Sequence, residues 1–307
     1  MCDAFDIEMD KLVAAGAANA TLGKVHSSVA EKLGLSTNTL VMIGCGDEHA
    51  ACLGVGVTRP GLVCDIAGTA EPVCASSAEL AFDPTHLVET HCHADPDLWL
   101  LENPGFVSGG NYRWLRDQFA KGESYSSLDA EAAVIPPGSE GMTFLPSLMG
   151  AMAPTWNEAA RGTFSGFTLA HTRGHFVRAL LEGSAYAVRD ITSQMQAIGV
   201  ELRELRVVSG GARSRLWNQI KADVTGLQVN VPEITETTAL GAAFLALVGI
   251  GAYATLSEAG DQIVKIRECI DPNPVNQSIY EEAYERYRQT YFALLPVFEQ
   301  AAGKVNG

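Results

Sequence analysis

The sequence has few basic residues: 21 Lys and Arg stand against 36 Asp and Glu among 307 residues, a formal charge of −15 at pH 7. A chain this acidic is not expected to bind nucleic acid or an anionic membrane surface, because both repel negative charge. It can still bind a nucleotide, since backbone N–H groups and a metal ion can hold phosphates. No apolar run approaches the ~20 residues of a membrane span, and the acidic first residues contain no signal-peptide core.

Paired cysteine motifs are also missing. The seven cysteines include no CxxC pair and lie mostly inside apolar runs. They are Cys2, Cys45, Cys52, Cys64, Cys74, Cys92 and Cys269. This usage favours buried free thiols in a cytoplasmic protein. A hydrophobic content of 47% with 19% charged residues is typical of a globular chain, and the length predicts about two domains.

Histidine motifs for a metal are incomplete. His91 and His93 would share one face of a strand, but no second cluster completes a ligand set. His171 and His175 have the i,i+4 spacing of a zinc helix, yet Thr172 stands where the glutamate of that motif would follow. We therefore assign no residue to a metal site and expect these histidines at ordinary polar positions.

The stretch Leu205–Ile220 predicts a buried strand, a glycine loop and a helix. Its apolar run ends at Ser209-Gly210-Gly211, and apolar residues at helical spacing follow. Glycines let a ligand approach the backbone, and a helix N-terminus attracts anions. The same pattern is also common where the chain merely turns, so both interpretations stay open.

A second candidate is Asp47, which follows the apolar run Thr39–Ile43 and precedes a predicted helix over Glu48–Val55. An acid at the carboxyl end of a buried strand is where α/β folds place their chemistry. The alternative is a helix N-cap, a position where Asp is common. Gly44-Cys-Gly46 before it lacks the third glycine of a dinucleotide fingerprint, which disfavours an oxidoreductase.

The rest of the chain predicts a mostly antiparallel run of strands followed by helices. A strand from Leu62 closes on Gly68-Thr69, which is either a phosphate-binding turn or a plain hairpin turn. Further strands are expected at 72–75, 85–92, 98–101, 142–149 and 228–231, and helices at 111–119, 171–198, 237–248 and 278–300. We expect residues 128–137 to form a loop.

Five segments occur in an order that resembles the FGGY family of carbohydrate kinases, nearest to the xylulokinases. They are IGCGDEHAACLGVGVTRPG, CDIAGTA, GFVSGGNYRWLRD, FLPSLMGAMAPTWNEAARGTFSG and VVSGGARSRLWNQIKADVTGLQVNVPEITETTALGAAFLA. The resemblance covers about residues 20 to 300 and implies an α/β protein with the actin-like ATPase (ribonuclease H-like) fold. It implies ATP and Mg²⁺ as cofactors and a sugar or polyol as substrate.

By this resemblance, Asp47 is the catalytic base and, with Glu48, contacts the sugar. The residues it implies for the nucleotide are Gly68 and Thr69 in a phosphate turn, Gly110 near it, and Gly210, Gly211, Ala212 and Ser214 in the adenosine loop. The family usually has Gln or Asn where this chain has Glu48, and often a third glycine where it has Ser209. The first departure leaves the preferred sugar open.

The resemblance also implies a domain boundary. Residues 1–60 resemble the end of the N-terminal family domain, carrying Asp47, and residues 61–307 resemble the complete C-terminal nucleotide-binding domain. The Asp-x-Gly-Thr/Ser phosphate clamp of the N-terminal domain does not occur, so about 200 residues of a usual kinase are missing. We expect exposed apolar surface and a partner: either the missing domain or another copy of the chain. The alternative to a kinase is a non-catalytic, nucleotide-binding relative.

Overall fold

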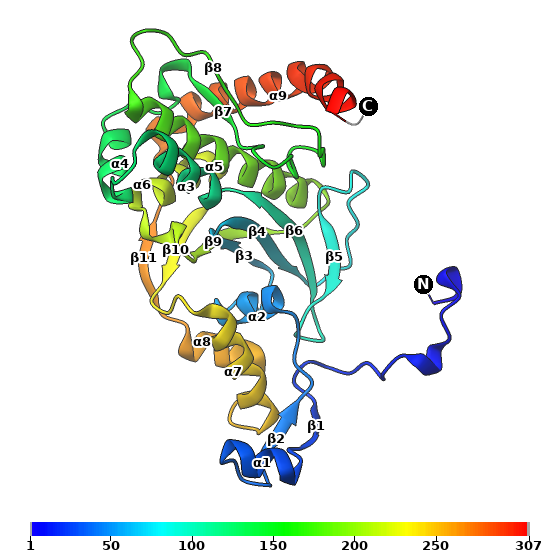
Figure 1. Ribbon diagram of the computed structural model, residues 1–307. Helices are drawn as coiled ribbons and strands as arrows, with labels where there is room; N and C mark the ends of the chain where they lie inside the picture. Colours follow the sequence, from blue (N-terminus) through cyan, green and yellow to red (C-terminus); the bar gives the residue numbers. More distant parts are fainter. Residues whose placement is uncertain (1, 306–307) are drawn as a thin grey trace.

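A seven-stranded mixed sheet forms the centre of the computed structural model, which describes residues 2–305 (Figure 1). In spatial order its strands are β11 (Ile266–Ile270), β10 (Gln228–Pro232), β9 (Leu202–Val208), β3 (Gly61–Ile66), β4 (Ala70–Ser77), β6 (Trp99–Val107) and β5 (Glu89–Cys92). Strands β3, β9 and β10 pair in parallel, and the other neighbours pair antiparallel. Parallel pairing brings the carboxyl ends of β3 and β9 to the same edge of the sheet.

Strand β3 is buried on both faces, which its continuous apolar sequence predicts. Leu62 and Cys64 pack against α2 (Asp47–Gly54) on one face. Val63 lies in the core on the other face, which α5 (Arg173–Ala197) covers. Because successive side chains of the strand point to opposite faces, the sheet packs against a layer of helices on each side.

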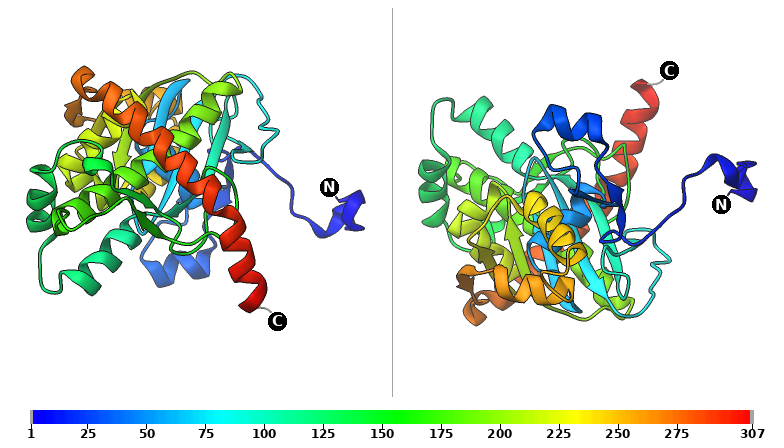
Figure 2. Two further views of the ribbon diagram at one scale, coloured as in Figure 1. Left: turned by 90° about the horizontal axis from the view of Figure 1, so that it is seen from above. Right: turned by 90° about the horizontal axis from the view of Figure 1, so that it is seen from below.

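The larger layer contains five helices and a two-stranded sheet, seen above the central sheet in Figure 1 and from above in Figure 2. They are α3 (Gly109–Phe119), α4 (Tyr125–Ala133), α5, α6 (Arg215–Thr225) and α9 (Gln277–Val305), with β7 (Thr143–Leu145) paired to β8 (Thr163–Ser165). Short 3-10 turns η3 (Ser139–Gly141), η4 (Gly211–Arg213) and η5 (Pro274–Asn276) join them. Their apolar faces form one continuous core.

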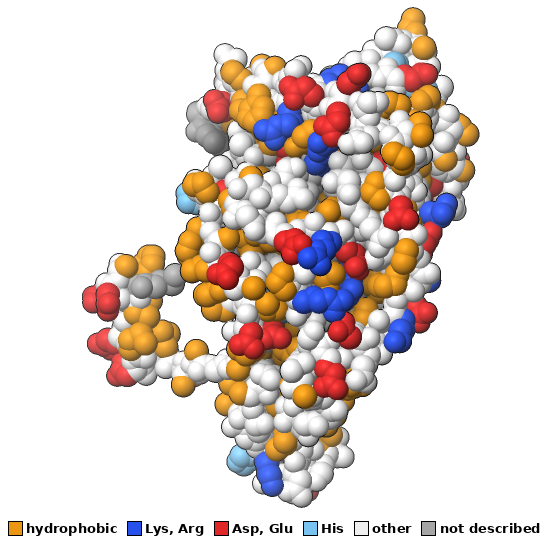
Figure 3. All heavy atoms as spheres, turned by 180° about the vertical axis from the view of Figure 1, so that it is seen from behind, with side chains coloured by type: hydrophobic (Ala, Val, Ile, Leu, Met, Phe, Trp, Pro, Cys, Tyr) orange, Lys and Arg blue, Asp and Glu red, His pale blue; other side chains and the backbone are white. Residues whose placement is uncertain are grey.

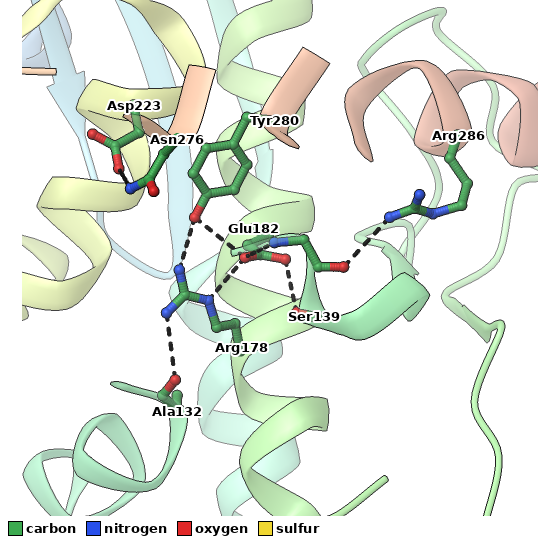
Figure 4. A network of polar contacts seen from close by, with 9 residues as sticks. Ala132, Ser139, Arg178, Glu182, Asp223, Asn276, Tyr280 and Arg286 are labelled. Carbon is green, nitrogen blue, oxygen red and sulfur yellow. Dashed lines mark hydrogen bonds and ion pairs between the residues drawn. The ribbon is translucent and has the colours of Figure 1, made fainter. Parts of the chain in front are cut away.

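A buried polar network fixes α5 to α9 and to the turn η3 (Figure 4). The Glu182 carboxylate accepts hydrogen bonds from Arg178 Nε at 2.9 Å and from Ser139 Oγ at 2.7 Å. Arg178 also donates to the Tyr280 hydroxyl at 2.8 Å. Burial raises the pKa of Glu182, while the guanidinium acts to lower it. Because every charge here has a partner, the network specifies how α9 docks.

The smaller layer consists of α2, α7 (Thr237–Gly249) and α8 (Leu256–Ile263). Helices α2 and α7 cross with their backbones in direct contact. A Cβ on Gly54 would lie 1.8 Å from the Thr237 carbonyl oxygen, and one on Gly241 would lie 1.7 Å from that of Ala50. Both positions therefore require glycine.

The first part of the N-terminal segment stands away from the body in Figures 1 and 2, whereas its later part lies beside α7. It contains η1 (Asp3–Phe5) and η2 (Met9–Lys11), and a ribbon of β1 (Thr21–Lys24) and β2 (Leu40–Met42) that encloses α1 (Ser27–Leu33). Apolar side chains appear on its surface and on the neighbouring flank of the body (Figure 3), as expected from the sequence. The prediction of a buried strand before Asp47 is wrong: Leu40 and Val41 are 38% and 39% exposed, because β2 pairs with β1 alone.

Most of the other predicted elements are confirmed, but the strands expected at 85–92 and 142–149 are shorter, since only Glu89–Cys92 and Thr143–Leu145 form strands. Residues 128–137 are not a loop, since α4 extends to Ala133, with Ser124 at its N-cap and Leu128 and Ala132 buried. The cysteines are not uniformly buried: Cys52, Cys64 and Cys74 are, whereas Cys92 and Cys269 are exposed. Among the described residues, no helix has the length and apolarity needed to cross a membrane.

Candidate functional site

Two cavities of about 490 and 460 Å³ lie on either side of the loop between β9 and α6. Ser209, Gly210 and Arg213 line both of them. We call the first the base cavity, because Asp47 and Glu48 line it, and the second the glycine cavity, because the Gly68–Thr69 turn lines it. The predicted residues from three distant stretches of sequence thus meet around a single loop.

Asp47 is the first residue of α2 and is exposed to the base cavity. Its Oδ1 accepts a hydrogen bond from the Glu48 N–H at 3.1 Å. Gly46 occupies the N-cap position, so the alternative of Asp47 as the cap is wrong. An acid in the first turn of a helix is stabilised by the free N–H groups and the helix dipole. The backbone thus holds the carboxylate in place and leaves it accessible.

The Gly68–Thr69 turn connects β3 to β4 and carries the N-terminus of α3. The N–H groups of Gly109 and Gly110 donate to the carbonyls of Gly68 and Thr69, each at 3.1 Å. A Cβ on Gly109 would lie 2.2 Å from the Gly68 oxygen. These glycines therefore allow α3 to approach the turn. Gly110 itself does not line either cavity in the described residues.

The loop after β9 places one glycine against open space. A Cβ on Gly210 would meet no atom within 4 Å, whereas one on Gly211 would lie 2.6 Å from the Ala67 Cβ. The Gly211 N–H donates to the Ala67 carbonyl at 2.8 Å, which fastens the loop to the end of β3. Ser209 has φ +70°, the left-handed region in which a non-glycine residue costs about 1–2 kcal/mol. This conformation explains why glycine suits that position.

The other two residues of the predicted adenosine loop have local structural roles. Ala212 is buried, and its carbonyl accepts a hydrogen bond from the Asn218 amide at 3.0 Å. Ser214 lines the glycine cavity and caps α6, because its Oγ accepts from the Trp217 N–H at 3.1 Å.

Several lining residues were not predicted from the sequence. Arg213 places a permanent positive charge beside both cavities. Glu236 and Thr237 line the base cavity at the start of α7, and Tyr112 and Tyr125 line the glycine cavity. Arg213 directly follows the glycine loop, and polar residues at a helix start are a recognisable signal. Nothing in the sequence indicated that the tyrosines face this space.

A fully buried ionic cluster joins the strands on either side of the Gly68–Thr69 turn to α6. Lys221 on α6 donates to Asp65 Oδ2 at 2.5 Å and to Glu71. Asp65 precedes the Gly68–Thr69 turn and Glu71 follows it, so one lysine joins both strands of the turn to α6. Burial and the adjacent Glu71 raise the pKa of Asp65 against the effect of the lysine. The two carboxylates raise the pKa of Lys221 although burial opposes them.

The residues present fit a nucleotide better than a protein-bound metal. Thr69 and Gly210 are exposed on the two sides of the glycine cavity, and Gly210 leaves room where a side chain would project. Within residues 2–305, no group of three or more His, Cys, Asp or Glu side chains is placed to hold a metal ion. A magnesium ion would therefore be held chiefly by phosphates and water, with a carboxylate such as Asp47 nearby.

The histidines considered above occupy ordinary polar positions, and the rings of His171 and His175 meet edge-on with their centroids 4.9 Å apart. His93 Nε2 donates to the Val57 carbonyl at 3.0 Å, and burial lowers the pKa of His93 to about 4. His91 lies 3.2 Å from Glu89. His175 belongs to the capping box of α5 with Thr172.

Comparison with known proteins extends this description. The profile of the FGGY family of carbohydrate kinases, C-terminal domain, matches residues 65–250. The chain is 31% identical over 271 residues to a xylulose kinase of Staphylococcus epidermidis, covering 88% of this chain and 54% of that protein. It is 33% identical over 285 residues to an autoinducer-2 kinase of Salmonella typhimurium, covering 88% and 53%. The chain thus spans about half the length of the curated relatives it matches.

The solved structures agree with the sequence relatives. The crystal structure of xylulose kinase from Rhodospirillum rubrum superimposes with a TM-score of 0.85 at 33% identity, covering 93% of this chain and 58% of that one. The predicted fold class, an α/β protein of the actin-like ATPase type, is therefore confirmed.

Proposed function

Because the chain belongs to the FGGY family of carbohydrate kinases, we propose that it supplies the base and the nucleotide site for ATP-dependent phosphorylation of a sugar or polyol hydroxyl. A xylulose-like substrate is the first candidate, since a xylulose kinase is among the relatives. The sequence match spans about half of those relatives, so we expect the whole reaction to need residues like those of their unmatched half. A domain corresponding to that half, or a second copy of this chain, is the expected partner.

One observation carries the proposal: the β9–α6 loop borders both cavities. A nucleotide held in the glycine cavity against Gly210 and Thr69 would direct its terminal phosphate along this loop toward Asp47. Arg213 lines both cavities and would balance the phosphate charge on the way. Phosphoryl transfer depends mainly on such positioning and charge balance.

The chemistry assigned to this chain is proton abstraction. The Asp47 carboxylate would accept the proton of a substrate hydroxyl. At the same time the hydroxyl oxygen would bond to the γ-phosphorus of ATP, and the bond from that phosphorus to the ADP oxygen would break. Bound Mg²⁺ would neutralise charge on the phosphates. Glu48 would contact the sugar from the same cavity. Gly68, Gly110, Gly211, Ala212 and Ser214 would shape the nucleotide site rather than react.

The test is ATP-dependent phosphorylation of D-xylulose and related polyols, measured by ADP release and by ³¹P NMR of the product. The chain is assayed alone and mixed with a separately produced N-terminal half of a xylulose kinase. We expect turnover in at least the mixture. ADP binding measured by calorimetry, with no turnover in either sample, would favour the alternative, a non-catalytic nucleotide-binding relative.

Asp47→Asn provides the matched variant. It keeps the shape of the side chain and removes the base, so we expect a 10²–10⁴-fold loss of turnover with ADP affinity unchanged. Asp10→Asn, an exposed change outside both cavities, is the control and should have no effect. Full activity of Asp47→Asn would show that another group takes the proton.

A further inference from the structure

An apolar cavity of about 340 Å³ lies in the larger helical layer. We call it the aromatic cavity, because Trp114 and Phe119 of α3, Phe164 of β8 and Phe176 of α5 line it. The three elements that form it are labelled in Figure 1. Its lining shares no residue with the base cavity or the glycine cavity. The proposed reaction therefore does not account for this space.

The walls of the aromatic cavity consist of two pairs of rings. Phe164 and Phe176 meet edge-on with their centroids 5.0 Å apart, and Phe164 also lies 4.4 Å from Phe144 in the core. Trp114 and Phe119 meet edge-on at 5.5 Å and are 36% and 65% exposed. One pair is thus anchored in the core, whereas the other is open to solvent. Rings in such arrangements pack favourably against a further aromatic ring.

One buried polar atom in this lining has no partner. His171 lines the cavity, and its Nε2 is buried without a hydrogen-bond partner among the described residues. The Thr168 N–H donates to His171 Nδ1 at 2.9 Å, so Nδ1 is an acceptor and the neutral ring carries its proton on Nε2. A buried N–H donor normally has an acceptor, which comes from the protein, from water or from a ligand. An oxygen atom of a ligand in the cavity would fill that role.

The other polar groups of the lining are already paired. Arg173 Nε donates to Glu131 at 2.9 Å, and a Glu123 oxygen lies 3.6 Å from the same guanidinium. Thr172 and His175 form the capping box of α5, which satisfies N–H groups at the start of this helix. One guanidinium beside two carboxylates leaves a net negative charge next to the cavity. This charge disfavours an anionic ligand.

We propose that the aromatic cavity binds an uncharged aromatic molecule that carries a hydrogen-bond-accepting oxygen, such as a phenol. The rings of Phe164 and Phe176 would pack against the aromatic part of the ligand. The Nε2–H of His171 would donate to its oxygen. A volume of about 340 Å³ is near the lower end for small-molecule sites, so a ligand of one or two rings fits. This binding is independent of the proposed kinase reaction.

The probe for this site is 2-naphthol, a two-ring phenol, titrated into the full chain at neutral pH and measured by isothermal titration calorimetry. We expect saturable binding with one molecule per chain. The anion 2-naphthoate has the same rings and carries a negative charge, so it should bind about tenfold more weakly or less tightly still. No binding of 2-naphthol, or equal affinity for the two probes, would overturn the inference.

His171→Phe separates the hydrogen bond from the packing. It removes the donor and keeps an aromatic ring, so we expect it to weaken 2-naphthol binding about tenfold. Binding of naphthalene, which has no oxygen, should stay unchanged. Phe119→Ser removes an exposed ring of the wall and should weaken both ligands. Phe292→Ser, at an exposed ring of α9 outside the cavity, is the matched control and should change neither.

Two further measurements locate the bound probe. ADP should not displace 2-naphthol, because the aromatic cavity and the glycine cavity share no residue. The variant Leu22→Ser with Leu33→Ser removes exposed apolar side chains of the N-terminal segment and should leave the affinity unchanged. Displacement by ADP, loss of binding in this double variant, or wild-type affinity in Phe119→Ser would overturn the inference. Phe119 is 65% exposed, so its variant decides the matter even if His171→Phe fails to fold.

Discussion

Lys221 connects α6 to the two strands that carry the Gly68–Thr69 turn of the glycine cavity. It is a fully buried cation between Asp65 and Glu71, which flank the Gly68–Thr69 turn. Lys221 bonds one oxygen of each carboxylate, and among the described residues the other two oxygens, Asp65 Oδ1 and Glu71 Oε2, have no hydrogen-bond partner. Removal of the lysine would thus leave two buried carboxyl groups without a counter-charge, and this is expensive in a low-dielectric interior.

We predict that Lys221→Met lowers the free energy of unfolding by about 3–5 kcal/mol, measured by urea denaturation. The triple variant with Asp65→Asn and Glu71→Gln should recover part of this loss, because no buried charge then remains. Lys265→Met, at an exposed position, is the control and should change stability by less than about 0.5 kcal/mol. Equal stability of Lys221→Met and the wild type would mean that the ionic cluster makes no net contribution to the free energy of unfolding.

Individual residues differed in how far the sequence could predict them. Asp47 and Gly210 were identified because each stands where a predicted strand or loop leads into a helix. Glu102 could not be identified, since it lies in the middle of β6, and its pKa is raised by burial and by Glu48, which is far away in the chain. Lys221 likewise reads as one more polar position of an amphipathic helix, and only the packing of α6 on β3 and β4 reveals its partners.

The crossing of α2 and α7 is the element-scale feature that fixes Asp47. Gly54 and Gly241 let the two backbones touch, and Asp47 begins α2. We predict that Gly241→Ala destabilises the protein by about 3 kcal/mol or more, because its Cβ would collide with the Ala50 carbonyl. The displaced α2 should also reduce any turnover. Thermal unfolding and the kinase assay measure the two effects.

Gly23→Ala is the control for this change, because a Cβ on Gly23 meets no atom within 4 Å. It should alter stability by less than about 1 kcal/mol. If Gly241→Ala were as stable as Gly23→Ala, the two helices would have to move apart without penalty, and the tight crossing would not hold Asp47 in place.

At the level of elements, periodicity predicted most strands and helices. Two of the wrong predictions, the loop at 128–137 and the buried strand before Asp47, have physical causes. The segment 128–137 is short and ends in Pro136-Pro137, so its helix depends on burying Leu128 and Ala132 against α5. The run before Asp47 is apolar enough for a core strand, yet β2 pairs with β1 alone and remains partly exposed. In both cases tertiary contacts decided what local sequence could not.

For the whole molecule, Glu102 predicts a specific dependence of stability on pH. Its pKa is raised from 4.5 to about 8, so the folded protein keeps a proton that the unfolded chain releases. Its contribution is therefore fully present below pH 4.5 and is lost as the pH rises to about 8. Relative to Glu102→Gln, the wild type should lose up to about 1.4 kcal/mol per pH unit across this window. Urea denaturation between pH 5 and 9 measures the difference.

A variant at an exposed acid is the control for the general effect of removing one negative charge. Glu31→Gln should follow the wild-type curve at every pH, because its side chain is exposed. Parallel curves for Glu102→Gln and the wild type would mean that the Glu102 pKa is ordinary in the folded state.

The exposed apolar side chains predict association of the whole chain. Val13 is 93% exposed, and Phe5, Leu22 and Leu33 are at least 65% exposed. We expect oligomers at micromolar concentration, measured by multi-angle light scattering, and binding of a dye that reports apolar surface. The variant Leu22→Ser with Leu33→Ser should weaken both. A monomer that binds no dye would contradict the prediction.

The parallel pairing of β3 with β9 also has a consequence for biosynthesis. These two central strands are neighbours in the sheet, but β3 is followed by five further strands and three helices before β9 is made. During translation, β3 must wait with one edge open until Leu202–Val208 leaves the ribosome, which makes closure of the sheet a late and slow event. Nascent chains that stall before this point would be natural clients of chaperones.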